Sequence, residues 1–238
     1  MIDSKIEVII LIVYTEVLRM HILLSTVRII IGIIFPRECA GCGKRDILLC
    51  LDCISHTPRA SETSQPFITA IFDYQNKAIR SLIWKFKYRN ARDASKIFGG
   101  LLYDEIIGEI GNDLRIRADE KFLLVPIPLH KNRLHERGYN QSELLAREIT
   151  KYDSEGILEI MPDALTRSRK TLPQAKSQKR LARFENLRGA FVADKEHVRG
   201  RHIILIDDVT TTGATLSEAR KALLTARAKS VRAYTVAH

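Results

Sequence analysis

Hydrophobic runs alternate with amphipathic stretches along the chain from Phe67 to the C-terminus. Short aliphatic or aromatic runs are typical of buried strands, and apolar residues at three- and four-residue spacing are typical of helices. The predicted strands are 67–72, 122–125, 164–165, 203–206 and 230–237. The predicted helices are 76–87, 94–106, 142–150 and 215–228. This alternation predicts an α/β fold, with a parallel sheet flanked by helices and joined by right-handed crossovers.

The most informative stretch runs from Ile203 to Leu216. Its four leading aliphatic residues predict a strand buried on both faces, as found in parallel sheets. Asp207 and Asp208 follow that run, and a Thr/Gly-rich turn then leads into a helix that opens at Thr215. Free backbone N–H groups in such a turn and at a helix N-terminus bind phosphate, while the acids can hold sugar hydroxyls or a metal. The stretch therefore predicts a site for a phosphate joined to a ribose.

A second loop with candidate chemistry follows the strand at 122–125. Lys131, Arg133 and Arg137 suit oxyanions, and Gly138 allows close approach of the backbone. Considered alone, this is a basic surface loop with a helix cap. Ligands of parallel α/β sheets bind beyond the carboxyl ends of the strands, so we expect this loop to face Asp207.

Four cysteines fall in one short segment with the spacing C-x2-C-x7-C-x2-C. They are Cys39, Cys42, Cys50 and Cys53, and the chain has no others. Two C-x2-C turns can point four thiolates at one centre, which is the arrangement of a structural zinc site with no open coordination position. A pair of disulfides or a redox C-x-x-C are the alternatives; the spacing favours zinc.

The charge balance favours anionic partners. The chain has 238 residues, 45% hydrophobic and 28% charged, and a formal net charge of +10, which suits nucleotides, nucleic acid or an acidic membrane surface. Basic residues concentrate between Arg167 and Arg188, in either a solvated loop or a cover over a polyphosphate. Aromatic content is only 7%, which does not favour stacking on single strands, and we expect Trp84 and Tyr88 to pack at i,i+4 spacing.

Residues 1–35 form an apolar N-terminal extension interrupted by charges. No uncharged run reaches the ~18 residues of a membrane span, and no secretory signal is clear. A second methionine, Met20, suggests that residues 1–19 are not native; an amphipathic helix lying on a membrane is the alternative. We expect a zinc module at 36–60, a main domain at 61–238, and a cytoplasmic location with membrane association as the alternative.

Several ordered motifs resemble one protein family. The strand with Asp207, Asp208 and the Thr-Thr-Gly-Ala-Thr turn resembles the signature for phosphoribosyl pyrophosphate (PRPP) in type I phosphoribosyltransferases. More selective motifs begin at Arg137-Gly138-Tyr139, at Arg167-x-Arg169-x-Thr171 and at Arg183-x-x-Asn186. Together with the four-cysteine segment that follows Phe35-Pro36, these motifs resemble the ComF family over most of the chain. The resemblance implies a type I phosphoribosyltransferase-like domain behind a small zinc-ribbon-like module.

The resemblance also implies roles for individual residues. Asp207 and Asp208 would bind the ribose hydroxyls and stabilise charge during catalysis. The 5-phosphate would be bound by the turn residues Thr211, Thr212, Gly213, Ala214 and Thr215. Pyrophosphate would be bound by Arg133, Arg137 and Gly138. A flexible hood would close over the site with Arg169, Thr171, Gln174 and Arg183.

The function implied by the resemblance is binding of PRPP with Mg²⁺ in a protein of natural competence and DNA uptake. A nitrogen acceptor, which the residues do not specify, would displace pyrophosphate from the ribose. The alternative is a non-catalytic nucleotide sensor, or a scaffold that binds nucleic acid or DNA-uptake proteins, because a fold does not fix a function.

Overall fold

The computed structural model describes residues 14–23, 26, 37–111, 120–167 and 189–238. Residues from Leu51 to the C-terminus form one compact unit, and the residues before Leu51 are treated separately. Residues 14–23 are helical and exposed. Within the described ranges, no helix combines the length and the hydropathy needed to cross a membrane.

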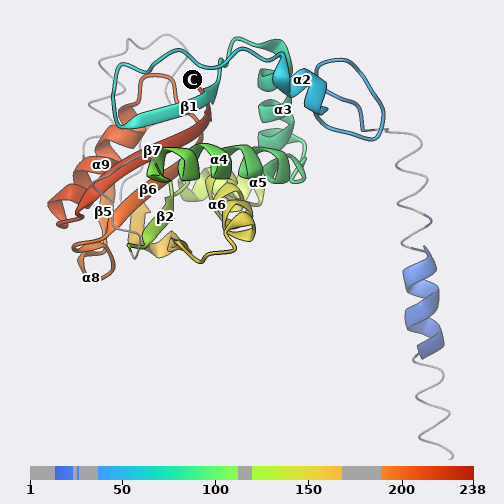
Figure 1. Cartoon of the computed structure of the whole chain (residues 1–238). Coiled ribbons are helices and arrows are strands. Elements are labelled where there is room, and N and C mark those ends of the chain that lie inside the picture. Colours follow the sequence, from blue (N-terminus) through green and yellow to red (C-terminus); the bar gives the residue numbers. More distant parts are fainter. Residues whose placement is uncertain (1–13, 24–25, 27–36, 112–119, 168–188) are drawn as a thin grey trace, which may run out of the picture. The chain divides into compact units, whose positions relative to one another are not determined.

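Helices and strands alternate in the compact unit, as the pattern predicts (Figure 1). The strands are β1 (Ile68–Phe72), β2 (Phe122–Pro126), β3 (Leu158–Ile160), β4 (Leu165–Arg167), β5 (Phe191–Ala193), β6 (His202–Val209) and β7 (Ser230–Ala237). The helices are α2 (Leu51–Ser55), α3 (Lys77–Tyr88), α4 (Ala94–Gly111), α5 (Lys131–Arg137), α6 (Gln141–Tyr152), α8 (Lys195–Val198) and α9 (Ala214–Thr225). One 3₁₀ turn, Pro162–Ala164, precedes β4.

Five strands form one parallel sheet in the order β1-β7-β6-β2-β3. This confirms the predicted parallel sheet flanked by helices. The chain leaves β2 toward β3 on one side and leaves β6 toward β7 on the other, while β2 and β6 are neighbours. A crevice opens at such a switch point beyond the carboxyl ends of the strands. The topology therefore directs a ligand to the ends of β2 and β6.

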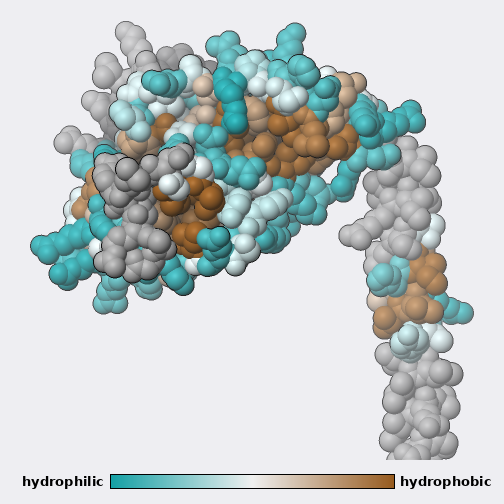
Figure 2. Space-filling view, viewed as in Figure 1, coloured by the Kyte–Doolittle hydropathy of each residue, from teal (hydrophilic) through white to brown (hydrophobic). Residues whose placement is uncertain are grey.

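Apolar side chains on both faces hold the sheet between helices. All five residues of β2 and the first five of β6 are buried, as expected for central parallel strands. The alternate residues Leu123, Val125, Ile203 and Leu205 join the core cluster that contains Leu216 and other buried residues of α9. Helices α4 and α6 pack on each other and against the opposite face (Figure 1). Helix α4 buries Phe98, Leu102 and Ile106, and hydrophobic surface gathers in the region of α3 and α4 (Figure 2).

Short elements depart from the predicted pattern. The strands β3 and β5 and the helices α5 and α8 were not predicted, because each is too short or too polar to produce a clear period. Strand β6 continues to Val209, so Asp207 and Asp208 lie within the strand, near its carboxyl end, rather than after it. β4 and β5 pair antiparallel as a separate ribbon.

Candidate functional site at the ends of β2 and β6

The register of the sheet brings the two predicted loops together. Pro126, the last residue of β2, lies beside Ile206 of β6, one residue before the acid pair. The chain then continues from β2 into α5, which carries Arg133 and Arg137. The structure therefore places the basic segment and the acid pair at the same edge of the sheet, as expected.

The two acids have different environments. Asp208 is 6% exposed, and its Oδ1 lies 2.8 Å from the Lys87 amine at the end of α3. Asp207 is half-buried, and its Oδ1 accepts hydrogen bonds from the Ser142 hydroxyl and from the backbone N–H of Asp208, both at 2.9 Å. Consecutive strand residues point in different directions, which explains why the acids meet different helices. Asp207 is the more exposed of the two residues as a whole, but its carboxyl group is enclosed by protein.

Two carboxylates share one nearby lysine, and this imbalance changes the acidity of Asp207. Burial, followed by the neighbouring charge of Asp208, raises the pKa of Asp207 to about 7. Lys87 and the Ser142 hydroxyl oppose the shift but do not cancel it. A cation or a hydroxyl donor placed against Asp207 would therefore relieve an electrostatic cost already present in the folded chain.

The turn after β6 has the geometry of a phosphate cradle. Gly213 adopts φ +71, which a residue with a Cβ adopts at a cost, and α9 begins at the next residue. The backbone N–H groups of Thr211, Thr212 and Gly213 have no acceptor among the described residues. With the free N–H groups of the first helical turn, which includes Thr215, they can bind an oxyanion.

Gln65 supports this turn from the opposite side. Its side-chain amide donates to the Thr212 carbonyl at 3.4 Å and accepts from the Ser217 hydroxyl. A Cβ at Gly213 would lie 2.7 Å from Gln65 Nε2 and 3.0 Å from Ile68 Cδ1. The segment before β1 is thus a structural support for the turn. A cavity of about 620 Å³ lies next to Gln65, and its lining includes none of the predicted ligand residues.

Three arginines lie on elements that follow the strands of this region: Arg133 and Arg137 on α5, and Arg167 at the end of β4. Arg137 donates to Gln141 Oε1 at 2.9 Å and to the Tyr88 hydroxyl at 3.3 Å, and Gly138 caps α5 with φ +74. Arg133 is exposed. Burial, and then the charge of Arg133, lower the pKa of Arg167, whereas the charge of Asp207 raises it. Arg167 ends β4, where the predicted basic segment begins.

The predicted hood lies outside the described residues. Its members Arg169, Thr171, Gln174 and Arg183 fall between β4 and β5, in 168–188. Their proposed role stays a prediction.

Sequence analysis missed three residues that support the site: Lys87, Ser142 and Gln65. One signal for Lys87 was present, because it follows Ile79 and Ile83 at four-residue spacing and so continues the buried stripe of α3. A lysine in that position needs a partner. Ser142 and Gln65 are small or neutral polar residues, and nothing in their local sequence points to a partner.

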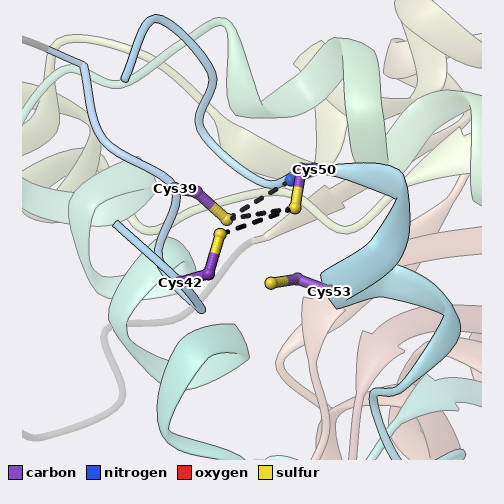
Figure 3. A group of neighbouring side chains, drawn as sticks. All are labelled: Cys39, Cys42, Cys50 and Cys53. Atoms are coloured by element: carbon purple, nitrogen blue, oxygen red, sulfur yellow. Dashed lines mark hydrogen bonds between the residues drawn. The ribbon is translucent and has the colours of Figure 1, made fainter. Parts of the chain in front are cut away.

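The four cysteines come together as predicted (Figure 3). Their Sγ atoms all lie within 4.8 Å of one another, and two of the separations, Cys39–Cys50 and Cys42–Cys50, are 3.7 Å. Four sulfurs at the ~2.3 Å Zn–S distance around one ion would be about 3.8 Å apart, whereas disulfide sulfurs are about 2.05 Å apart. The spacing fits a tetrahedral metal site and not a disulfide pair.

Local backbone structure prepares the cluster for a metal. Gly43 takes φ +76 in the first knuckle, and the α2 helix carries Cys53. Burial alone would raise the pKa of Cys39, but backbone N–H groups of Cys42, Cys50 and Gly41 outweigh it and lower that pKa to about 6. A thiolate is the metal-binding form of cysteine, so the fold favours ligation.

Several known proteins are similar to this chain in sequence. The family described as Phosphoribosyl transferase domain matches residues 145–238. The DNA utilization protein YhgH of Escherichia coli K12 is 29% identical over 82% of this chain and 86% of its own length. Competence protein ComFC of Bacillus subtilis is 31% identical over 70% of this chain and 62% of its own, and Competence protein F of Haemophilus influenzae is 30% identical over 60% of each.

Among solved structures, hypoxanthine-guanine phosphoribosyl transferase of Leishmania donovani covers 60% of this chain and 67% of its own, with 14% identity and a TM-score of 0.37. The family match and the parallel sheet together confirm the predicted fold class, a phosphoribosyltransferase-type sheet flanked by helices with a four-cysteine cluster near the N-terminus.

Proposed function

Because this chain is a homologue of the ComF-family competence proteins, we propose that its strand-end site binds PRPP together with Mg²⁺. One observation carries the proposal: Asp207 and Asp208 end the same strand whose following turn offers free N–H groups, and cationic residues of α5 belong to the same edge. A ligand with a phosphate at one end, a ribose in the middle and a second anionic group matches these three parts of the site: the turn, the acid pair and the cationic residues.

Each part of the ligand has a proposed partner. The turn from Thr211 to Thr215 would bind the 5-phosphate through backbone N–H groups and hydroxyls. Asp207 would accept hydrogen bonds from the ribose hydroxyls, because Asp208 is already held by Lys87. Arg133 and Arg137 would bind pyrophosphate, because a guanidinium offers two parallel donors to an oxyanion.

The chemistry that this arrangement supports is displacement at the ribose C1. The bond from C1 to the pyrophosphate oxygen breaks, a C1–N bond to the acceptor forms, and the acceptor nitrogen releases its proton. Asp207 would stabilise the positive charge that develops on the ribose, and the arginines would stabilise the leaving group. Mg²⁺ bound with the pyrophosphate would neutralise part of its negative charge.

Isothermal titration calorimetry with PRPP and Mg²⁺ tests the binding proposal. We expect saturable binding by the wild-type chain and at least about tenfold weaker binding by Asp207→Asn, because loss of a charged hydrogen-bond acceptor costs about 1.5–3 kcal/mol. Glu120→Gln, at the other end of β6, is the matched control and should bind as the wild type does. Absence of binding by the wild type, or unchanged binding by Asp207→Asn, would contradict the proposal.

A non-catalytic role in DNA uptake is the second candidate. It is favoured by the names of the relatives, which concern competence and DNA utilization, and by the net charge of +10. Release of pyrophosphate from PRPP in the presence of ammonia, amides or nucleobases distinguishes the two. Binding without any release would favour a PRPP sensor or scaffold over a transferase.

We also propose that the cysteine cluster binds a structural Zn²⁺ through Cys39, Cys42, Cys50 and Cys53, because the sulfur separations fit that ion. Metal analysis of the purified chain should give one zinc per molecule, and Co²⁺ substitution should give the visible absorption of a tetrahedral thiolate site. Cys42→Ser should lower the zinc content. A metal-free chain with an unchanged near-UV spectrum would contradict a structural role for zinc.

A further inference from the structure

Strand β5 has one edge without a strand partner in the part of the chain that the structure describes, because it pairs with β4 in a ribbon separate from the main sheet. The Asp194 N–H donates to the Ala164 carbonyl at 2.9 Å, which fixes the phase of the β4–β5 ladder. Antiparallel ladders alternate, so the peptide groups of Val192 face β4, and those of Phe191 and Ala193 face outward. No described residue bonds to the N–H and C=O groups of Phe191 and Ala193.

A groove lies along this outer edge, between β5 and helix α9, which pack against each other (Figure 1). Its volume of about 400 Å³ falls within the range of about 300–1,000 Å³ for ligand pockets. All three residues of β5 line it, and those of β4 do not. Because consecutive strand side chains point to opposite faces, such a lining places the groove at the edge of β5 and not on one face. The small side chains of Ala222 and Ala226, which share one face of α9, form its other wall.

The lining of the groove combines apolar side chains with unneutralised positive charge. Lys195 and Lys221 line it and are exposed, and neither amine has a carboxylate partner among the described residues. Its one carboxylate, that of Glu218, accepts a hydrogen bond from the Gly189 N–H at 3.1 Å. Two copies of the chain paired through β5 would bring their lysines together, so like-charge repulsion disfavours a second copy as the occupant.

We propose that the outer edge of β5 and the groove beside α9 bind an extended peptide segment of a partner protein, in which carboxylates flank alternating apolar side chains. The segment would add a third strand to the ribbon by pairing with the peptide groups of Phe191 and Ala193. Its apolar side chains would enter the groove, and its carboxylates would contact Lys195 and Lys221. A two-stranded ribbon is only marginally stable by itself, so the added strand would also stabilise β4 and β5. This binding does not depend on PRPP.

A library of random heptapeptides displayed on phage tests the proposal with the full-length protein. We expect enrichment of sequences that alternate apolar residues and carry acidic residues on either side of them. In NMR titrations, a selected peptide should shift the amide signals of Phe191 and Ala193 saturably and slow their hydrogen exchange, because both N–H groups gain acceptors. Enrichment of basic or unpatterned sequences, or no protection of these two amides, would overturn the inference.

Two sets of variants separate the groove from general effects on folding. Ala222→Trp fills the groove and should weaken the selected peptide at least about tenfold, whereas Leu224→Trp adds the same side chain to α9 outside the lining and should not. The exposed pair Lys195→Glu/Lys221→Glu should also bind about tenfold more weakly, and should bind a version of the peptide with lysines in place of its acids more tightly than the wild type does. Equal affinities of wild type and charge-reversed protein, or dimers that exclude the peptide in sedimentation, would contradict the proposal.

Discussion

The two ends of strand β6 differ in how many basic partners each carboxylate has. At the carboxyl end, Asp207 and Asp208 have one lysine between them, Lys87. At the amino end, one carboxylate has two basic partners: Glu120 contacts Lys229, and its Oε2 lies 2.9 Å from His202 Nε2, although not aligned for a hydrogen bond.

The amino end is further stabilised by a hydrogen bond within the sheet. His202 Nδ1 lies 2.6 Å from the Ser230 hydroxyl on the neighbouring strand, and the two residues are register partners. Compensated charge at one end of a strand stabilises the fold, whereas two carboxylates with one ion pair between them leave negative charge that a cationic or hydroxyl-bearing ligand can satisfy. The comparison therefore supports the proposal of a ligand site at the carboxyl end on electrostatic grounds.

The largest expected effect comes from removing the acid that Lys87 neutralises. Asp208→Ala would leave the lysine amine, 19% exposed, without its carboxylate, and we expect a loss of about 2–4 kcal/mol in the free energy of unfolding. Urea denaturation measures it. The double variant Asp208→Asn/Lys87→Met should recover most of the loss. If Lys229→Met at the amino end costs as much as Asp208→Ala, the two ends do not differ as described.

The next largest effect comes from the turn beyond the acids. Gly213→Ala would place a Cβ 2.7 Å from Gln65 Nε2 at a positive φ, with an expected cost of about 1–3 kcal/mol in stability. The displaced turn should also bind PRPP at least about tenfold more weakly, as calorimetry would show. Gly200→Ala, also at positive φ but with open space around its Cβ, is the matched control and should leave binding unchanged. Equal effects of both variants would mean that strain, and not the contact with Gln65, is responsible.

At the carboxyl end, the local sequence predicted the part of the site that is continuous in the chain, but not the residues that other segments bring to it. The aliphatic run, the acid pair and the Thr/Gly turn lie in one continuous segment, so their chemistry can be inferred from spacing. Lys87 and Gln65 come from distant parts of the chain and reach the site only through tertiary packing. Periodicity showed that α3 has a buried face, but it could not show that Trp84 stays half-exposed.

The protonation of Asp207 makes the difference between the two ends of β6 testable, because the stability of the carboxyl end should depend on pH. Its pKa is about 7 in the folded chain, compared with the ordinary 3.8, so between about pH 4 and 7 the folded chain holds a proton that the unfolded chain has lost. The contribution of Asp207 to the free energy of unfolding therefore falls as pH rises through that window. Asp207→Asn should remove this dependence and be more stable by about 1–2 kcal/mol above pH 7.

Unfolding in urea at about pH 5 and about pH 8 measures this difference. Binding of Mg²⁺ and PRPP should strengthen over the same interval, because a carboxylate, and not a carboxylic acid, attracts the cation. Parallel pH profiles of the wild type and Asp207→Asn would contradict the assignment of the shift to Asp207.

The smallest expected effect tests the compensated end. Glu120→Gln removes a carboxylate that is 19% exposed and meets the half-exposed Lys229 and the buried His202, so we expect a loss of about 0.5–1 kcal/mol in the free energy of unfolding. PRPP affinity should not change, because the residue lies at the far end of β6. Added salt should reduce the loss, since partly exposed ion pairs are screened. A change in ligand affinity without a change in stability would mean that the amino end also takes part in binding, and the electrostatic distinction between the two ends would fail.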